Sequence, residues 1–190
     1  MCSINGTSKK LLLVGSYTDS ILFQLAIEVA KHGQKVWFLA NKPFETIPKE
    51  VQHECKEYLE LITFIYLSTF EELVKLFNGI HKRQQVPSVI ILKGLDQFCN
   101  FYSSVEEAYD ARTTAYLIAS ILDGMLYLNR KNSNKTSLLL VSCYDDENNL
   151  LLNERLKTLY DMYFDECLYE GSFVFGDVLN KIAFSLKFNI

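Results

Sequence analysis

The sequence predicts an α/β domain with a mostly parallel sheet and helices on both of its faces. Short, continuous apolar runs recur along the chain, and this pattern is typical of strands that are buried on both sides. Segments with the apolar spacing of amphipathic helices alternate with these runs, as in parallel sheets joined by crossover helices. The length of 190 residues fits a single domain over residues 1–190, in which residues 1–10 are expected to be a flexible N-terminus.

Four strands and three helices are expected in the first half of the chain. Asp19 or Ser20 can cap the first helix, and Ser68 with Glu71 forms a capping box for the third. The strand candidates are the apolar runs at residues 11–14, 36–40, 61–66 and 89–92. The helix candidates run from Asp19 or Ser20 to Gly33, over residues 51–58, and onward from Ser68.

The second half is expected to begin with a loop rich in aromatic residues and to continue with further helices and strands. A long helix is expected over about residues 105–129, a fifth strand over residues 138–141 and another helix over residues 150–163. Alternating apolar and polar residues predict C-terminal strands at residues 167–169 and 182–186.

The turn after the first strand has the position of a phosphate loop but not its residues. A phosphate loop reads GxxxxGK[ST], in which glycines let backbone N–H groups surround the phosphates, the lysine reaches them and the hydroxyl binds magnesium. Gly15 stands at the first position of this pattern. Ser20 replaces the second glycine, Ile21 the lysine and Leu22 the hydroxyl residue. We therefore expect no cofactor at these positions.

The strand end that would supply a magnesium-binding acid also departs from the pattern. The apolar run 89–92 is followed by Lys93, whereas a nucleotide site needs an acidic residue there. Asp96 lies three residues further on. We expect no catalytic residue in this chain. Two alternatives remain open, namely an ordinary α/β turn that never bound nucleotide and an ATP-binding enzyme with an unusual loop that uses Asp96 for magnesium.

Several segments resemble one family of proteins. The relevant residues are Leu11 to Gly15, Val36 to Leu39, Lys42-Pro43, Ser68-Thr69, Ile90 to Asp96 and the helix segment Thr114 to Asp123. In this order they are similar to the RecA-like recombinase paralogue that partners a SWIM-domain zinc protein in the animal Shu complex. The resemblance covers about two thirds of the chain, and the segment from Tyr116 to Asp123 is its most specific part.

The resemblance implies a RecA-like, P-loop-type fold and a role in homologous recombination. The chain would form a heteromer with a SWIM-domain zinc protein and assist a strand-exchange recombinase, or its paralogues, on single-stranded DNA. Such a protein would be nuclear. Because Ile21, Leu22 and Lys93 cannot take the family's ATP-binding roles, ATPase activity does not carry over. A generic α/β interaction module unrelated to recombination is the remaining alternative.

Charge and cysteine usage limit what the chain binds alone. The net charge is −4, so strong DNA binding is expected to need a partner. Short basic runs are ordinary features of solvated loops, and the expected loop 129–136 supplies the candidates for a DNA contact, which are Arg130, Lys131 and Lys135. The five cysteines form no CxxC pair and no histidine lies at metal-ligand spacing from another ligand, so no metal site is expected. No apolar stretch is long enough to span a membrane.

Overall fold

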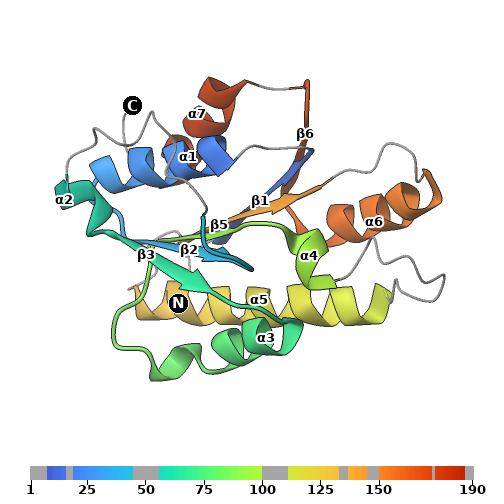
Figure 1. The fold of residues 1–190 in the computed structure, drawn as a ribbon, viewed down its shortest axis with the longest axis horizontal. Helices are drawn as coiled ribbons and strands as arrows, with labels where there is room; N and C mark the ends of the chain where they lie inside the picture. The colour runs from blue at the N-terminus through green and yellow to red at the C-terminus, as the bar shows by residue number, and fades with distance from the viewer. Residues whose placement is uncertain are drawn as a thin grey trace, which may run out of the picture.

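The protein is an α/β structure with a six-stranded, all-parallel sheet covered by helices on both faces (Figure 1). The computed structural model describes residues 8–15, 19–44, 56–99, 111–132, 137–144, 150–172 and 174–186. The strand order is β3-β2-β4-β5-β1-β6. The strands are β1 (Ser8–Val14), β2 (Val36–Ala40), β3 (Ile62–Tyr66), β4 (Val89–Leu92), β5 (Ser137–Cys143) and β6 (Glu166–Tyr169).

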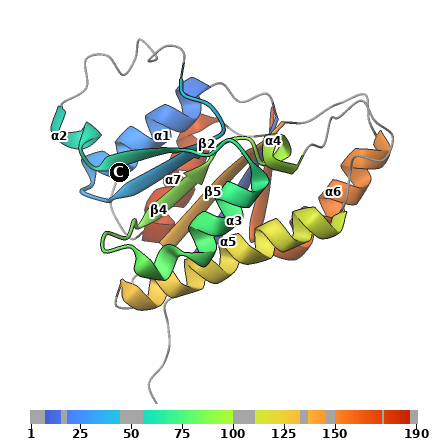
Figure 2. The same ribbon diagram turned by 60° about the horizontal axis from the view of Figure 1, so that its bottom comes forward.

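The described helices lie on opposite sides of this sheet. They are α1 (Asp19–Lys31), α2 (Lys56–Leu59), α3 (Phe70–Asn78), α4 (Leu95–Cys99), α5 (Ala111–Lys131), α6 (Leu150–Tyr163) and α7 (Phe175–Leu186). Figures 1 and 2 show α1 and α7 on one face and α3 and α5 on the other. A 3₁₀ turn at Ile80–Lys82 follows α3.

Alternate residues of each central strand pack into two separate cores. Leu11 and Leu13 of β1 belong to the core under α1 and α7, whereas Leu12 and Val14 belong to the core under α3, α5 and α6. Every residue of β2, β4 and β5 is buried, as the continuous apolar runs predict. The predicted α/β class and the five predicted strands up to residue 141 are confirmed, with shifts at their ends.

Several predicted boundaries differ from the observed ones. β1 begins at Ser8, so Ser8 to Lys10, which we expected in a flexible N-terminus, form the first residues of a strand. The predicted helix over residues 51–58 is observed as α2 from Lys56, and residues 51–55 lie outside the described part of the chain. Part of the loop expected after β4 is the short helix α4.

The cap of α3 lies one residue later than predicted. Thr69, not Ser68, is the N-cap residue, and its Oγ1 accepts a hydrogen bond from the backbone N–H of Glu72 at 3.3 Å. Glu72 in turn accepts from the backbone N–H of Ser68 at 2.6 Å. These bonds satisfy N–H groups at the start of the helix that have no partner within it. The capping chemistry was predicted correctly, but Ser68 and Glu71 are not the pair that supplies it.

The predicted strand at residues 182–186 is wrong, because this segment belongs to helix α7. Val178 and Ile182 are four residues apart and both are buried against the core under α1, so helical periodicity decides the structure. Phe184 follows the period-two pattern that suggested a strand, yet it is 88% exposed.

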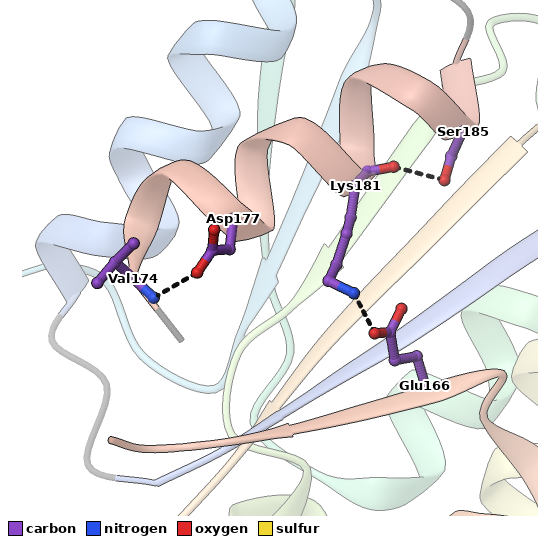
Figure 3. Close-up of polar contacts among 5 residues, drawn as sticks. All are labelled: Glu166, Val174, Asp177, Lys181 and Ser185. Atoms are coloured by element: carbon purple, nitrogen blue, oxygen red, sulfur yellow. Dashed lines mark hydrogen bonds and ion pairs between the residues drawn. The ribbon is translucent and has the colours of Figure 1, made fainter. Parts of the chain in front are cut away.

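Polar contacts at both ends of α7 fit a helix (Figure 3). Asp177 accepts from the backbone N–H of Val174 at 3.1 Å at its start, and Ser185 donates to the carbonyl of Lys181 at 2.7 Å near its end. An ion pair between Lys181 and Glu166 joins α7 to β6.

Helices α3 and α5 pack closely at Gly124. A β-carbon at this position would lie 2.7 Å from ring atom Cδ1 of Phe77, which is fully buried in α3. Contacts this short do not occur between real side chains, so only glycine fits α5 at this point without movement of its neighbour. Of the described helices, none is long and apolar enough to cross a membrane.

Candidate functional site

The carboxyl edge of the sheet is where an α/β fold usually binds ligands. The connection after β1 leads to α1 on one face, while the connection after β5 leads to α6 on the other. Because β1 and β5 are neighbours, the chain departs in opposite directions between them, which is the kind of position at which α/β sheets bind ligands. Gly15, Lys93 and Asp96 follow the strands at this edge.

Gly15 is enclosed by neighbouring strands rather than open to a ligand. Its φ angle of 145° is in the region that favours glycine. The backbone N–H of Gly15 donates to the carbonyl of Cys143 at 3.0 Å, and Glu170 N–H donates to the carbonyl of Val14 at 2.8 Å. A β-carbon at Gly15 would lie 2.5 Å from both Cβ and a carboxylate oxygen of Glu170. A carboxylate of the chain itself therefore lies against the position where the turn of a phosphate loop would begin.

The three substituted positions of the phosphate loop belong to helix α1. Leu22, at the position of the magnesium hydroxyl, is 1% exposed and packs in the core under α1 and α7. Ile21, at the position of the lysine, is half-buried against the same core. Ser20 is the second residue of α1. The two apolar side chains thus contribute to folding, and neither offers a polar atom to a phosphate.

Lys93 turns toward the segment that follows β2. Its backbone N–H donates to the carbonyl of Leu39 at 2.9 Å, and its ammonium nitrogen lies 5.2 Å from the centre of the Phe44 ring. This distance is within the range of a cation–π interaction. A cation therefore occupies the strand end at which a nucleotide site has an acid.

Asp96 is a buried residue of α4 with a structural hydrogen bond. Its side chain accepts from the backbone N–H of Tyr144 at 2.9 Å, which fixes the chain just after β5, and the residue is only 6% exposed. Burial raises the pKa of this carboxyl, and hydrogen bonds from Tyr144, from its own backbone and from Cys143 oppose the rise. The alternative in which Asp96 holds magnesium from an open loop does not match this position.

The raised pKa of Asp96 predicts a particular pH dependence of stability. The folded state binds the proton more tightly than the unfolded state, whose pKa is near 3.8. Stability is therefore highest below the unfolded pKa and falls as pH rises through the folded pKa. We expect Asp96→Asn to flatten this fall in urea unfolding between about pH 4 and 8. The same substitution at exposed Asp123 should keep the wild-type profile, and an unchanged profile in Asp96→Asn would contradict the assignment.

Two buried thiols lie in the same core as Asp96. Burial raises the pKa of Cys99 to about 12, and it raises the pKa of Cys143 well above the usual range of a thiol. The sulfur of Cys143 lies 2.9 Å from the hydroxyl oxygen of Tyr160. These thiols stay protonated at neutral pH, and a protonated thiol is a poor nucleophile and metal ligand.

The amino edge of the sheet has a different character, because exposed cations gather there. The backbone N–H of Ser88 donates to the carbonyl of Lys35 at 2.9 Å, so the residues before β4 and β2 lie together. Lys131, at the end of α5, donates to the carbonyl of Arg83 at 2.5 Å, and the Arg83 guanidinium lies 6.0 Å from the centre of the Trp37 ring. We call this the amino-edge basic surface, defined by the exposed residues Lys35, Lys82, Arg83, Arg130 and Lys131.

Few acidic residues accompany these cations in sequence. Residues 29–44, 79–95 and 124–144, which contain the whole surface, include no Asp or Glu. Acids do stand at the starts of the two outer strands: exposed Glu60 lies just before β3, and Asp165 and Glu166 lie at the start of β6, where they pair with Lys10 and Lys181. A chain with a net charge of −4 therefore concentrates positive charge at one edge of its sheet.

The structure brings together two of the three predicted DNA-contact residues and adds others. Arg130 and Lys131 lie in the last turn of α5, not in a loop as predicted, and Lys135 lies outside the described residues. Lys35, Lys82 and Arg83 were not predicted as site residues. The signal that identifies them is their place before the starts of β2 and β4, because parallel strands bring their amino ends to one edge.

Comparisons with known proteins add no family to this description. No protein-family model and no curated protein sequence matches this chain. Within the described ranges, no three His, Cys, Asp or Glu side chains come close enough together to hold a metal ion. The two edges of the sheet and the resemblance in the sequence are therefore the features that indicate a function.

Proposed function

We propose that this chain is a non-catalytic, RecA-like subunit that contacts single-stranded DNA in a complex with a SWIM-domain zinc protein. In this role it promotes homologous-recombination repair in the nucleus by helping a strand-exchange recombinase assemble on single-stranded DNA. The partner, the recombinase and the nuclear location come from the sequence resemblance. The DNA contact comes from the amino-edge basic surface, which is the observation that carries the proposal.

Features of the carboxyl edge support a role without nucleotide hydrolysis. Phosphoryl transfer needs a cation that holds the phosphates and an acid that holds magnesium. Leu22 is buried in the hydrophobic core, and the ammonium group of Lys93 lies over the Phe44 ring. The Asp96 carboxyl accepts a hydrogen bond from the backbone N–H of Tyr144. These placements favour a binding subunit over the alternative ATPase.

The basic surface supports contact with a nucleic-acid backbone. Exposed lysine and arginine side chains neutralise phosphates and release counterions, which provides most of the sequence-independent affinity for nucleic acids. Five such side chains lie at one edge. This number is modest for a protein that binds DNA alone, and it agrees with a contact shared with a partner.

The partner is tested by purifying the tagged chain from its native cells and identifying the associated proteins by mass spectrometry. A SWIM-domain protein recovered in near-equal amount supports the proposal. A chain that elutes as a monomer with no such protein contradicts it.

The DNA contact is tested by charge removal in the purified complex. We expect a variant with Lys82, Arg83, Arg130 and Lys131 all changed to Gln to bind a labelled single-stranded oligonucleotide at least about tenfold more weakly at moderate salt. The slope of log affinity against log salt should also fall by roughly 0.7 for each phosphate that the variant no longer neutralises.

The matched control removes the same number of charges elsewhere, at exposed Lys42 after β2, Lys56 in α2, Arg112 in α5 and Lys157 in α6. Changing these four to Gln is expected to leave affinity and salt slope as in the wild-type complex. Equally weakened binding in both variants would mean that net charge, not the amino edge, governs binding, and the proposed contact would then be wrong.

A further inference from the structure

The segment that leads from the 3₁₀ turn to β4 is bound to the C-terminal end of helix α5 (Figure 2). We call residues 81–88 the α3–β4 connection. Three of its carbonyl groups accept hydrogen bonds from side chains of α5 or of the residue that follows it. The donor–acceptor pairs are Tyr127 to His81 at 3.4 Å, Lys131 to Arg83 at 2.5 Å and Asn132 to Pro87 at 3.1 Å. The end of α5 therefore sets the position of the connection that carries two cations of the amino-edge basic surface.

Arg83 is held in place at its backbone and at its side chain. Its N–H donates to the carbonyl of Ile80 at 3.1 Å, and its own carbonyl accepts the bond from Lys131. Its guanidinium carbon lies 6.0 Å from the centre of the Trp37 ring, within the range of a cation–π interaction. A guanidinium has five N–H donors in one plane, so it can lie beside a ring and still bind a phosphate through two of them. Arg83 is thus a positioned cation that remains exposed at the amino edge.

Lys131 uses its ammonium group within the protein. The nitrogen that donates to the Arg83 carbonyl also lies 6.0 Å from the centre of the Tyr127 ring, one helical turn before it. Among the described residues of α5, Tyr127 and Lys131 bond to the α3–β4 connection, whereas the exposed neighbour Arg130 does not. An ammonium that bonds a carbonyl and lies beside a ring has less freedom to follow a phosphate than the neighbouring guanidinium. Two adjacent cations of α5 therefore have different surroundings.

We infer that Lys131 is a positioning residue that holds Arg83 where it binds a phosphate of single-stranded DNA, while Arg83 and Arg130 make separate phosphate contacts. This inference rests on the proposed nucleic-acid contact and assigns different roles to the cations of that surface. A side chain that is ordered before binding loses less conformational entropy when the ligand arrives, so its contact contributes more affinity. The effect of removing Lys131 should therefore depend on the presence of Arg83.

The test is a double-mutant cycle in the purified complex, with labelled oligothymidine as the probe. At about 0.15 M salt, loss of one phosphate contact should weaken binding about fourfold and lower the salt slope by roughly 0.7. Arg83→Gln is expected to show this loss. Lys131→Met removes the charge and the donor but keeps a good helix former, and it should weaken binding about two- to fourfold. In the Arg83→Gln background, Lys131→Met should have a further effect below about 1.5-fold.

The matched control is the same cycle with Arg130→Met in place of Lys131→Met. The two positions are adjacent in α5, and both changes remove one exposed positive charge. Because Arg130 does not bond to the α3–β4 connection, its loss and that of Arg83 should multiply to about sixteenfold, with a slope lower by roughly 1.4.

Hydrogen exchange in the complex without DNA measures the positioning directly. Lys131→Met should speed amide exchange in a peptide that covers residues 81–88, Arg130→Met should not, and thermal unfolding should show that every variant is folded.

Three results would overturn the inference. They are unchanged exchange in Lys131→Met, losses at Lys131 and Arg83 that multiply, and losses at Arg130 and Arg83 that do not. In each case the proposed DNA contact stands if the variant with four charges removed from the amino edge binds weakly. If that variant binds as the wild-type complex does, the proposed contact and this inference both fail.

Discussion

Replacing Gly124 with valine is expected to lower the free energy of unfolding by about 3 kcal/mol. The first added carbon alone would lie 2.7 Å from a ring atom of buried Phe77, and valine adds two methyl groups at the same place. Either α5 moves away from α3 or Phe77 leaves its position, and both changes disrupt a packed core. In a chain of this size the effect corresponds to a melting temperature lower by roughly 6–12 °C, which calorimetry or circular dichroism can measure.

The matched control is Gly176→Val in α7. A β-carbon at Gly176 meets no atom within 4 Å, so this variant tests valine in a helix without the steric clash. It should stay within about 1 kcal/mol of wild type, because the helix propensities of glycine and valine are similar. Shortening the opposing side chain with Phe77→Leu should recover part of the stability of Gly124→Val, since the two residues are in contact. Equal effects at both glycines would show that the α3–α5 packing is looser than described.

Restoring the phosphate-loop residues is expected to destabilise the fold without creating an ATP site. In the variant Ser20→Gly, Ile21→Lys, Leu22→Thr, the third change removes buried methyl groups and places a hydroxyl in the core under α1. We expect the Leu22→Thr change alone to lower the free energy of unfolding by about 2–4 kcal/mol. Glu170 would still lie against Gly15, and Lys93 would still occupy the strand end.

The loss of stability and the absence of nucleotide binding are measured separately. Leu126→Thr is the control for stability, because Leu126 is 49% exposed on α5 and the same substitution should cost less than about 1 kcal/mol there. For nucleotide, a fluorescent ATP analogue with magnesium should show no saturable binding to the folded fraction of the triple variant. Tight, magnesium-dependent binding by this variant would show that Glu170 and Lys93 do not prevent nucleotide binding, and this part of the prediction would then be wrong.

The sequence predicted the layered class well because its signals were local and strong. The continuous apolar runs in β2, β4 and β5 are short and are typical of strands buried on both faces, which is what the structure shows. The signal failed at residues 182–186, where five residues alternate but Val178 and Ile182 lie on one helical face and decide the structure. A short window could not distinguish the two periods, and the longer one from Phe175 could.

The candidate site was only partly predictable, because much of it depends on tertiary contacts. The departures from the phosphate-loop pattern at Ile21, Leu22 and Lys93 were visible in the sequence. Glu170 lies against Gly15 although the two residues are far apart in the chain, so no local sequence pattern predicts this contact. The amino-edge basic surface likewise forms only when the strand order is known, since Lys35, Arg83 and Lys131 come from three separate segments.

The place of β1 in the sheet has a consequence for how the protein forms during synthesis. β1 lies between β5 and β6, and Ser8 of β1 pairs with Ser137 of β5. The apolar segment of β1 therefore stays without these strand partners until more than 120 further residues have been made. Pairing across so long a separation is slow, and an unpaired apolar strand is prone to associate with other chains. We therefore expect chains truncated before β5 to aggregate and the intact protein to depend on chaperones during translation.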